Sequence, residues 1–377
     1  MGHPRLTESY EIAVIGGGIV GAACFHELAS AGARVCLVEP SIIGGGATAA
    51  GMGHITVMDD SEAQFALTRY SQMLWKELAR RLRPDAEYLT CGAIWVADDE
   101  DEMAEVERRF HRYAGHGTPV EVLDSRALAV LEPNLRQGLS GGLLVKDDAV
   151  VYSTAVARQL VEEATELSGT VIRDGRIIRI NSDEALVQDG STIRAKAFVI
   201  ATGIAAPSLA PEVEVRPRKG HLVITDRYPG FAQHQLIELG YLKSAHATQE
   251  NSVAFNIQPR TTGQLLIGSS RQFGGDDRAV EDDILSRMLA RAFEYMPGLR
   301  KCSAIRSWTG FRAATPDRLP LIGPSQGAAN VYLATGHEGL GITTALGTAK
   351  LVAKQLLGTP CSLPVAPYLP SRSYTHA

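Results

Sequence analysis

The chain has 377 residues, of which 45% are apolar and 21% charged, and its formal net charge is −5. This composition is typical of a soluble globular protein with one large or two intertwined domains. The slight negative charge excludes the basic footprint of a nucleic-acid-binding protein, so we expect a small molecule as the partner.

The cysteines and the apolar runs narrow the class further. The five cysteines stand far apart without a C-x-x-C pair, which excludes the usual zinc and iron–sulfur spacings and favours a reducing compartment. We therefore expect no metal site. No uncharged apolar run reaches the ~18 residues of a membrane span, and the first residues lack the layout of a signal peptide. The expectation is a cytoplasmic protein without a transmembrane segment, or one held at the inner membrane only through a complex.

The first forty residues predict a strand, a helix and a second strand. The stretch YEIAVIGGG (10–18) is typical of a buried parallel strand, IVGAACFHELASAG (19–32) of a helix that ends at a glycine, and ARVCLVEP (33–40) of a second buried strand. Together they have the ~30-residue length of one βαβ unit. Similar strands recur at 195–203 and 330–336, and both end in Thr-Gly, where a parallel sheet meets its ligand crevice.

Between these pieces the pattern becomes antiparallel. Residues 252–270 predict two alternating strands around a turn, residues 220–228 another strand, and residues 281–296 an amphipathic helix that ends at Pro297-Gly298. The predicted fold is therefore α/β, with a discontinuous Rossmann-type nucleotide-binding domain and an inserted α+β substrate domain built on an antiparallel sheet. We expect the first domain over residues 1–85, 142–212 and 305–370, and the second over residues 86–141 and 213–304.

Gly16, Gly18 and Gly21 form the spacing G-x-G-x-x-G between the first strand and the first helix. The first glycine permits a sharp turn, the second lets a pyrophosphate approach the backbone, and the third lets the helix pack closely on the strand. The helix N-terminus offers free N–H groups to phosphate. Glu39 ends the second strand, where it would accept hydrogen bonds from an adenosine ribose and repel the 2′-phosphate of NADP. These residues predict a dinucleotide site, but they do not separate FAD from NAD.

Residues 44–53, GGGATAAGMG, carry almost no large side chains, and His54 follows them directly. An NAD-binding domain usually continues with further short βα units at this point. Small residues instead let the backbone pass close to a bulky planar ligand. The stretch therefore favours an FAD that lies extended from its adenine to its isoalloxazine, with an NAD-dependent dehydrogenase as the alternative.

Four stretches resemble the D-amino-acid oxidase superfamily of flavoproteins, particularly glycine oxidases, sarcosine oxidases and the β subunits of amino-acid dehydrogenases. They are the first βαβ unit with its glycine-rich extension, AFVIATG (197–203), SWTGFRAATPDRLPLIG (307–323) and ATGHEGLGITTALGTAKLVAKQLLG (334–358). The last two are the most specific of the four. The segments GMGH (51–54) and FNIQPRTTGQLLIGSS (255–270) are most similar to the β subunits of D-hydroxyproline dehydrogenases.

The resemblance implies a bound FAD, and a non-covalent one, because Cys302 and Cys361 match no position at which monomeric sarcosine oxidases attach their flavin. Apolar residues at helical spacing from Ile342 onward predict a helix whose N-terminus would stabilise the anionic edge of the reduced flavin. The residues implied in FAD binding are Gly16, Gly18, Ile19, Val20, Gly21, Glu39, Pro40, Ala47, Thr48, Gly51, Gly53, His54, Val171, Ala201, Thr202, Gly203, Gly336, His337, Gly339, Leu340, Gly341 and Ile342.

By the same resemblance, Arg312 pairs with the substrate carboxylate, and His54 lies beside the isoalloxazine. Guanidinium suits a carboxylate because its planar donors match the two oxygens. Asn256 would bind a ring hydroxyl or the carboxylate. For His54 the alternative stays open that the imidazole only satisfies a loop carbonyl. We expect structural roles for His221 and Tyr241.

Two departures from the family pattern lie near Arg312. Ala313 stands where the relatives have proline, a change too small to move the guanidinium far. His337 and Glu338 stand where glycine oxidases carry an arginine, which puts a second carboxylate anchor from this loop in doubt.

The implied activity is FAD-dependent oxidation of the C–N bond of a small amino or imino acid, by hydride transfer from the α-carbon to flavin N5. A secondary amine such as D-hydroxyproline or D-proline is the expected substrate. The electrons would pass to partner subunits, either a ferredoxin-like protein or a second flavoprotein, or to a quinone. Two alternatives stay open: an oxidase of the glycine or sarcosine type that uses O2, and a flavin electron-relay subunit without an amine substrate of its own.

Overall fold

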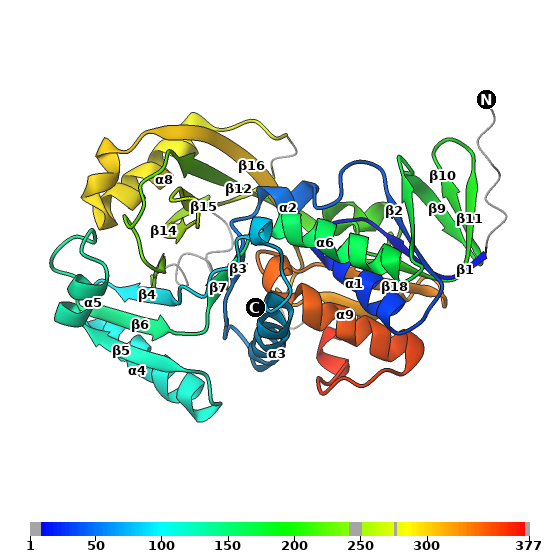
Figure 1. The fold of residues 1–377 in the computed structure, drawn as a ribbon, viewed down its shortest axis with the longest axis horizontal. Helices are drawn as coiled ribbons and strands as arrows, with labels where there is room; N and C mark the ends of the chain where they lie inside the picture. Colours follow the sequence, from blue (N-terminus) through cyan, green and yellow to red (C-terminus); the bar gives the residue numbers. More distant parts are fainter. Residues whose placement is uncertain (1–8, 241–250, 275–276, 374–377) are drawn as a thin grey trace.

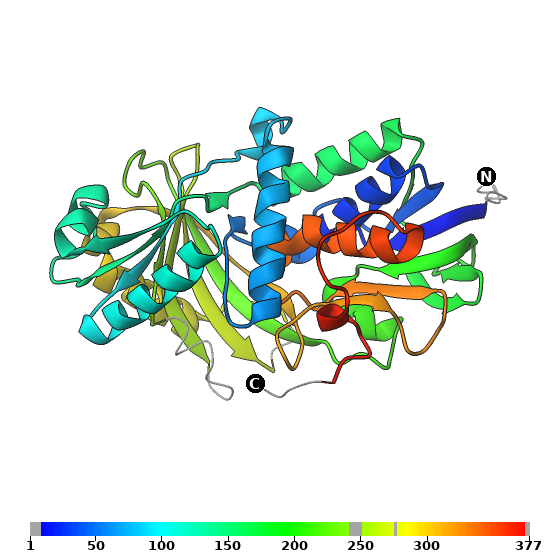
Figure 2. The same ribbon diagram turned by 90° about the horizontal axis from the view of Figure 1, so that it is seen from below.

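The computed structural model describes residues 9–240, 251–274 and 277–373. Figure 1 shows two lobes side by side, and Figure 2 shows helix α3 (Glu62–Ala79) lying between them. Each lobe is built on one sheet, which has eight strands among the described residues. Within those residues, no helix combines the length and the apolar character that a membrane crossing requires.

The first sheet contains the predicted βαβ unit and confirms the α/β class. Its path runs β17-β18-β11-β1-β2-β8, with β9 and β10 attached beside β11. β1 pairs in parallel with both β11 and β2, so the N-terminal strand lies at the centre of the sheet. The strands come from three separated stretches of chain, as the discontinuous domain requires. They are β1 (Ser9–Ile15), β2 (Val35–Glu39), β8 (Thr170–Arg173), β9 (Ile177–Asn181), β10 (Glu184–Val187), β11 (Thr192–Ile200), β17 (Leu321–Pro324) and β18 (Val331–Thr335).

Helices cover this sheet. α1 (Ile19–Ser30) is buried along most of its length because it packs between α6 (Ser153–Glu166) and α9 (Gly341–Leu357). Most sides of α1 therefore face the core, and its polar residues His26, Glu27 and Ser30 lie in its less buried C-terminal half. The other helices of the described chain are α2 (Gly46–Ala50), α4 (Glu100–Gly115), α5 (Ser125–Leu131), α8 (Asp282–Tyr295) and the short 3-10 turns η1 (Pro84–Ala86), η2 (Gly203–Ser208), η3 (Pro297–Lys301) and η4 (Ala366–Tyr368).

The second sheet contains the predicted antiparallel hairpin, β14 with β15, and its neighbour β12. Its path is β16-β12-β15-β14-β13-β4-β6-β5, and all pairs are antiparallel except β13 with β4. α8 covers one face, where Tyr295 stacks on Phe255 at 4.5 Å between ring centroids. The strands are β4 (Ala93–Ala97), β5 (Val120–Asp124), β6 (Gly141–Val145), β12 (Arg216–Thr225), β13 (Gln235–Glu238), β14 (Ser252–Pro259), β15 (Leu265–Phe273) and β16 (Ala304–Ala314).

Two of these strands lie at the expected domain limits. β6 begins just before residue 142 and β16 ends after residue 305, yet both pair within the second sheet. Each expected limit therefore falls inside or at the edge of a strand of the second sheet. The chain changes lobes where β6 is followed by β7 (Ala149–Val150), which pairs with β3 (His54–Ile55). The exact limits of the two domains stay a prediction.

Candidate active site

A cavity of about 430 Å³ lies between the two sheets. One end is lined by residues at the carboxyl ends of β1, β2, β11 and β18, where a parallel sheet binds its ligand. The other end is lined by residues of β12, β14, β15 and β16 from the second sheet. The volume falls within the range of small-molecule sites, about 300–1,000 Å³.

The glycine turn between β1 and α1 lies at the first end of the cavity, as the spacing G-x-G-x-x-G predicts. Gly16 has a φ of +103°, which L side chains rarely adopt. A Cβ on Gly21 would stand 1.8 Å from the carbonyl oxygen of Gly16, so the third glycine lets α1 pack on β1 and does not itself line the cavity. Thr48 contributes a cap that the spacing did not predict, because its Oγ1 accepts a hydrogen bond of 3.0 Å from the N–H of Ile19.

Glu39 lies at the end of β2 and lines the cavity. Its Oε2 accepts a hydrogen bond of 2.7 Å from the N–H of Gly17, and its Oε1 accepts one of 2.9 Å from the N–H of Ser41. The carboxylate therefore stabilises the glycine turn by hydrogen bonding and also lines the cavity. Each oxygen keeps a further lone pair with which it can accept a ligand hydroxyl.

The glycine-rich stretch after β2 contains a short helix that lines the cavity. Residues Gly46–Ala50 form α2, whose small side chains let β16 approach closely: a Cβ on Gly310 would stand 2.4 Å from the Cβ of Ala50. Gly53 has a φ of +104°, and a Cβ there would stand 2.0 Å from the carbonyl oxygen of Val151. The small residues thus line the cavity and also allow close packing against the second sheet.

His54 lines the cavity next to this stretch. Burial, and then the nearby charge of Arg312, lower the pKa of His54 to about 3, so the imidazole is neutral at physiological pH. Its Nε2 is buried and has no hydrogen-bond partner among the described residues, and its carbonyl oxygen accepts a hydrogen bond of 2.9 Å from Thr343 Oγ1 in α9. In the described chain, no carbonyl satisfies this nitrogen.

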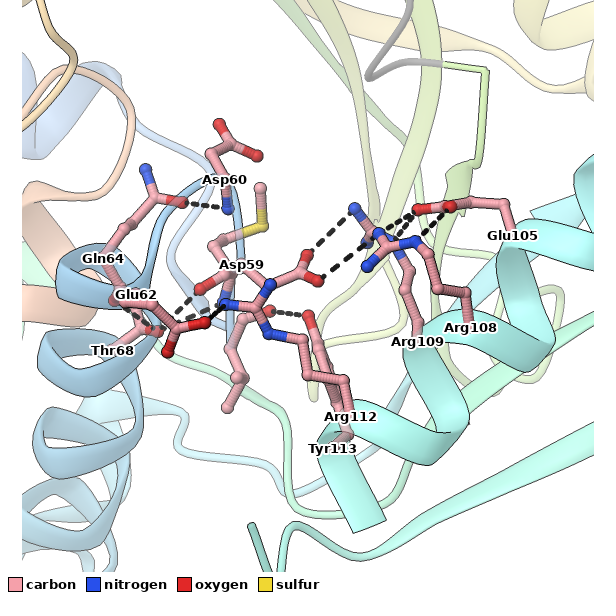
Figure 3. Close-up of polar contacts among 12 residues, drawn as sticks. Asp59, Asp60, Glu62, Gln64, Thr68, Glu105, Arg108, Arg109, Arg112 and Tyr113 are labelled. Carbon is pink, nitrogen blue, oxygen red and sulfur yellow. Dashed lines mark hydrogen bonds and ion pairs between the residues drawn. The ribbon is translucent and has the colours of Figure 1, made fainter. Parts of the chain in front are cut away.

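A buried ion pair fixes the loop that follows His54 (Figure 3). The carboxylate of Asp59 is fully buried and lies 2.9 Å from Nη2 of Arg109 in α4, which is 3% exposed. Arg109 Nε also donates to Glu105 at 2.9 Å, and its guanidinium stacks over the ring of Trp95. α4 packs on β4, β5 and β6 of the second sheet. The ion pair therefore connects the lobe built on that sheet to the segment that carries His54.

Further polar side chains hold the backbone of the same loop. Asp148 Oδ1 accepts a hydrogen bond of 3.1 Å from the N–H of Val57, and Tyr113 in α4 donates one of 3.3 Å to the carbonyl of Val57. Burial raises the pKa of Asp148 well above its usual range. These bonds leave the loop little freedom, so His54 is held on a rigid support.

Arg312 lies on β16 and lines the second end of the cavity. Its Nη1 donates a hydrogen bond of 2.9 Å to the carbonyl of Ser270, which orients the guanidinium. A Cβ on Gly220 would stand 2.5 Å from that Nη1, whereas a Cβ on Gly339 would stand 3.7 Å from the Cδ and Nε of Arg312, an ordinary contact. Gly220 therefore makes the space that the guanidinium occupies. No sequence spacing links Gly220 to Arg312, because only the pairing of β12 with β16 brings them together.

Asn256 on β14 and Ser269 on β15 also line the cavity. Asn256 Oδ1 and Ser269 Oγ are both buried, and neither has a hydrogen-bond partner within the described residues. Buried polar atoms are rarely left without a partner in folded proteins. With His54 Nε2 they form a set of polar atoms that a polar ligand would satisfy. Ser269 was missed in the sequence, since one serine on a strand carries no signal.

Most residues implied in FAD binding line this one cavity. Val171 does not, because it lies within β8 and packs on the core; Gly175, Arg176 and Ile177 line the cavity instead. Leu340 also packs on the core, one residue before α9 begins. The residues that line the cavity as expected are Gly16, Gly18, Ile19, Val20, Glu39, Pro40, Ala47, Thr48, Gly51, Gly53, His54, Ala201, Thr202, Gly203, Gly336, His337, Gly339, Gly341 and Ile342.

Three further predictions concern His337, His221 and Tyr241. His337 borders the cavity, but its Nε2 lies 2.9 Å from Thr348 Oγ1, so the ring is directed at α9. His221 is fully buried: its Nδ1 lies 3.0 Å from Ser270 Oγ, and its Nε2 accepts a hydrogen bond from the N–H of Glu281. These contacts agree with a structural role. Tyr241 lies outside the described residues.

The residues present fit FAD. The glycine turn and the N-terminus of α1 would hold the pyrophosphate, and Glu39 the ribose. The second helix N-terminus, that of α9, borders the same cavity at Gly341 and Ile342, where it would face the flavin ring. His54 Nε2 and Thr202 Oγ1 are buried polar atoms without protein partners in the described chain, as expected of groups that meet a ligand.

Comparisons with known proteins agree with this geometry. The chain is 28% identical to a glycine oxidase of Geobacillus kaustophilus over 378 residues, covering 96% of this chain and 97% of the relative. A crystal structure of glycine oxidase from the same organism superposes with a TM-score of 0.87 at 27% identity, covering 98% of this chain and all of that one. An L-proline dehydrogenase from P. horikoshii shares the fold, with a TM-score of 0.87 at 23% identity over 96% of this chain and 97% of that one.

The family pattern described as "DAO: FAD dependent oxidoreductase" matches residues 11–355. That range includes both sheets, except for the first two residues of β1, and every residue that lines the cavity. FAD is therefore the cofactor, and the NAD alternative is excluded. The chain belongs to the DAO family of FAD-dependent oxidoreductases.

Proposed function

We propose that the protein oxidises the Cα–N bond of a small amino or imino acid, and that a cyclic secondary amine such as D-hydroxyproline or D-proline is its preferred substrate. The observation that carries the proposal is the position of Arg312, whose guanidinium borders the same cavity as the glycine turn and the N-terminus of α9. A carboxylate bound there would place the atoms attached to its α-carbon between the second sheet and the cofactor. The glycine oxidases to which the chain is similar support an amino-acid substrate.

The substrate end has the polarity that a hydroxylated ring requires. Met52 and Leu222 supply apolar surface, while Asn256 Oδ1 and Ser269 Oγ are polar atoms without partners in the described chain. Asn256 Oδ1 can accept a hydrogen bond from a ring hydroxyl or from an N–H of the substrate. These four residues favour an apolar ring with one or two polar substituents over a long or charged side chain.

Bound FAD supplies the two-electron acceptor, and the protein supplies position and electrostatics. Arg312 holds the carboxylate and thereby fixes the α-carbon. His54, with its pKa of about 3, stays neutral and is a poor proton acceptor, so we expect it to hold the amine by a hydrogen bond rather than deprotonate it. The amine then enters in its neutral form, having lost its proton to solvent.

FAD is expected to be bound without a covalent link. Among the described residues that line the cavity there is no cysteine, and Cys24 and Cys36 are buried in the core. Acid precipitation of the purified protein should leave the yellow colour in the supernatant. Colour that stays with the pellet would overturn this part of the proposal.

The decisive experiment is anaerobic mixing of the FAD-loaded protein with a panel of D- and L-amino and imino acids. We expect D-proline or D-hydroxyproline to bleach the flavin absorbance fastest. Bleaching by glycine or sarcosine alone would favour the oxidase of that type, for which the similarity to glycine oxidases is the supporting observation. A fully loaded flavin that no substrate bleaches would favour the relay subunit.

The electron acceptor needs a second measurement on the reduced protein. We propose that electrons pass to partner subunits, a ferredoxin-like protein or a second flavoprotein, or to a quinone. Reoxidation by air that is slow compared with bleaching, and fast with a quinone analogue, would support this. Fast reoxidation by O2 with release of hydrogen peroxide would identify an oxidase instead.

A further inference from the structure

Two guanidinium groups lie on neighbouring strands near the substrate end of the cavity. Arg218 on β12 and Arg312 on β16 are directly opposed in the antiparallel pair. Arg312 Nη1 donates to the carbonyl of Ser270, and Arg218 forms an ion pair with the carboxylate of Glu338. Arg218 is only 8% exposed, and its guanidinium lies 4.3 Å from the centroid of the Phe273 ring. Opposed like charges destabilise a sheet, so the pair needs a counter-charge.

Glu338 provides that counter-charge from a fixed position. Its N–H donates a hydrogen bond of 2.8 Å to the carbonyl of Ala313, which places it beside Arg312. Its Oε1 bonds Arg218, while its Oε2 is buried and has no hydrogen-bond partner among the described residues. Glu338 lines the cavity, whereas Arg218 is not among the residues that line it.

The charged side chains that line the cavity differ between its two ends. Of the described residues that line it, Arg312 and Glu338 carry the charge at the substrate end, and Glu39 and Arg176 stand at the nucleotide end. Arg312 can pair with one substrate carboxylate, whereas a second carboxylate would meet that of Glu338.

We propose that Glu338 restricts the substrate to one carboxylate, because it occupies Arg218 and repels a second carboxylate on the substrate. The inference rests on the proposed function and names its substrate class: monocarboxylic amino and imino acids are accepted, and dicarboxylic ones are rejected. Rejection by a like charge is a common source of specificity. Without Glu338, Arg218 would become a second guanidinium available to a carboxylate.

The test compares FAD-loaded full-length protein with its Glu338→Gln variant, which keeps the size of the side chain and removes its charge. The substrates are D-proline and pyrrolidine-2,4-dicarboxylate, the same ring with a second carboxylate. We expect the wild-type protein to prefer D-proline, and the variant to shift the ratio of kcat/KM toward the dicarboxylate by about tenfold or more. An unchanged ratio in the variant, or a wild-type protein that oxidises both equally well, would overturn the proposal.

A second variant covers the case in which Glu338→Gln does not fold. Arg218→Gln leaves the carboxylate of Glu338 without this cation, so its repulsion of any substrate carboxylate increases. We expect KM for D-proline to rise about tenfold in this variant, with a smaller change in kcat. A KM that stays at the wild-type value would contradict a charge of Glu338 that acts on the substrate.

A binding measurement separates this inference from the proposed function. Pyrrole-2-carboxylate and pyrrole-2,4-dicarboxylate need no turnover, and their Kd values can be read from the change that they cause in the flavin absorbance. We expect Glu338→Gln to lower the ratio of the dicarboxylate Kd to the monocarboxylate Kd by about tenfold. If the wild-type protein oxidises no amino or imino acid, the proposed function fails, and this ratio still decides the role of Glu338.

Discussion

The two ends of the cavity are built in different ways. The nucleotide end uses backbone: Gly16, Gly18 and the N-terminus of α1 come from one short stretch, and glycine is needed where a Cβ would collide. The substrate end uses side chains from β12, β14, β15 and β16, together with the turn before α9. A site made of backbone leaves a fixed spacing in the sequence, whereas a site made of side chains on paired strands leaves none.

The largest effect is expected where the backbone is most crowded. In Gly21→Ala the new Cβ would stand 1.8 Å from the carbonyl oxygen of Gly16, so α1 must move away from β1. We expect loss of FAD and a destabilisation of about 3 kcal/mol or more. The FAD content of the purified protein and its thermal unfolding measure both. Gly115→Ala, in α4, is the matched control because a Cβ there meets no atom within 4 Å; similar losses in both variants would refute the close-packing argument.

At the other end, Arg312→Ala should act on the substrate and leave the cofactor bound. Removal of a guanidinium that pairs with a carboxylate should lower kcat/KM by about 10²- to 10³-fold. Arg312→Lys keeps the charge but loses the planar fork, so we expect an intermediate value. Steady-state kinetics with D-proline test this, with Arg194→Ala on the exposed part of β11 as control. A normal KM in Arg312→Ala would remove this residue from the substrate site.

The connection between the two lobes can be tested through the Asp59–Arg109 pair. Arg109→Met leaves the buried carboxylate of Asp59 with only the more distant Arg108, 3.8 Å away, which should cost about 3 kcal/mol of stability. The double variant Asp59→Leu, Arg109→Met should recover much of that loss, because two apolar side chains need no partner. Chemical denaturation of the three proteins provides the comparison. A double variant as unstable as Arg109→Met would show that packing, not charge, is what the pair contributes.

The smallest effect concerns pH. Burial lowers the pKa of His54 and of His337 to about 3, from 6.5. As pH falls below 6.5 the unfolded chain takes up protons that the folded chain refuses, so the stability from these groups is complete above pH 6.5 and is lost as pH falls toward 3. We expect the urea midpoint to fall between pH 7 and pH 5 by on the order of a few tenths of a molar more in the wild-type protein than in His337→Gln. Equal shifts would assign the acid sensitivity to other groups.

The sequence was informative where neighbouring residues act together. The strand, glycine turn, helix and acid at residues 10–39 follow one another at a spacing that only a dinucleotide site requires, and the structure contains them in that order. The hairpin of β14 and β15 and the limits of α8 also follow from local alternation and helical periodicity. Arg312 was found through a family motif, since a single arginine has no pattern of its own.

Tertiary structure decided what local patterns cannot encode. It turned residues 46–50 into α2, packed Val171 and Leu340 into the core, and directed the ring of His337 at Thr348. It also paired Asp59 with Arg109 and Arg218 with Glu338, whose charges lie far apart in the chain. The sequence by itself determined the α/β class and the nucleotide end, because backbone geometry there depends on adjacent residues. The substrate end depends on the register between strands, and that register exists only after the second sheet has formed.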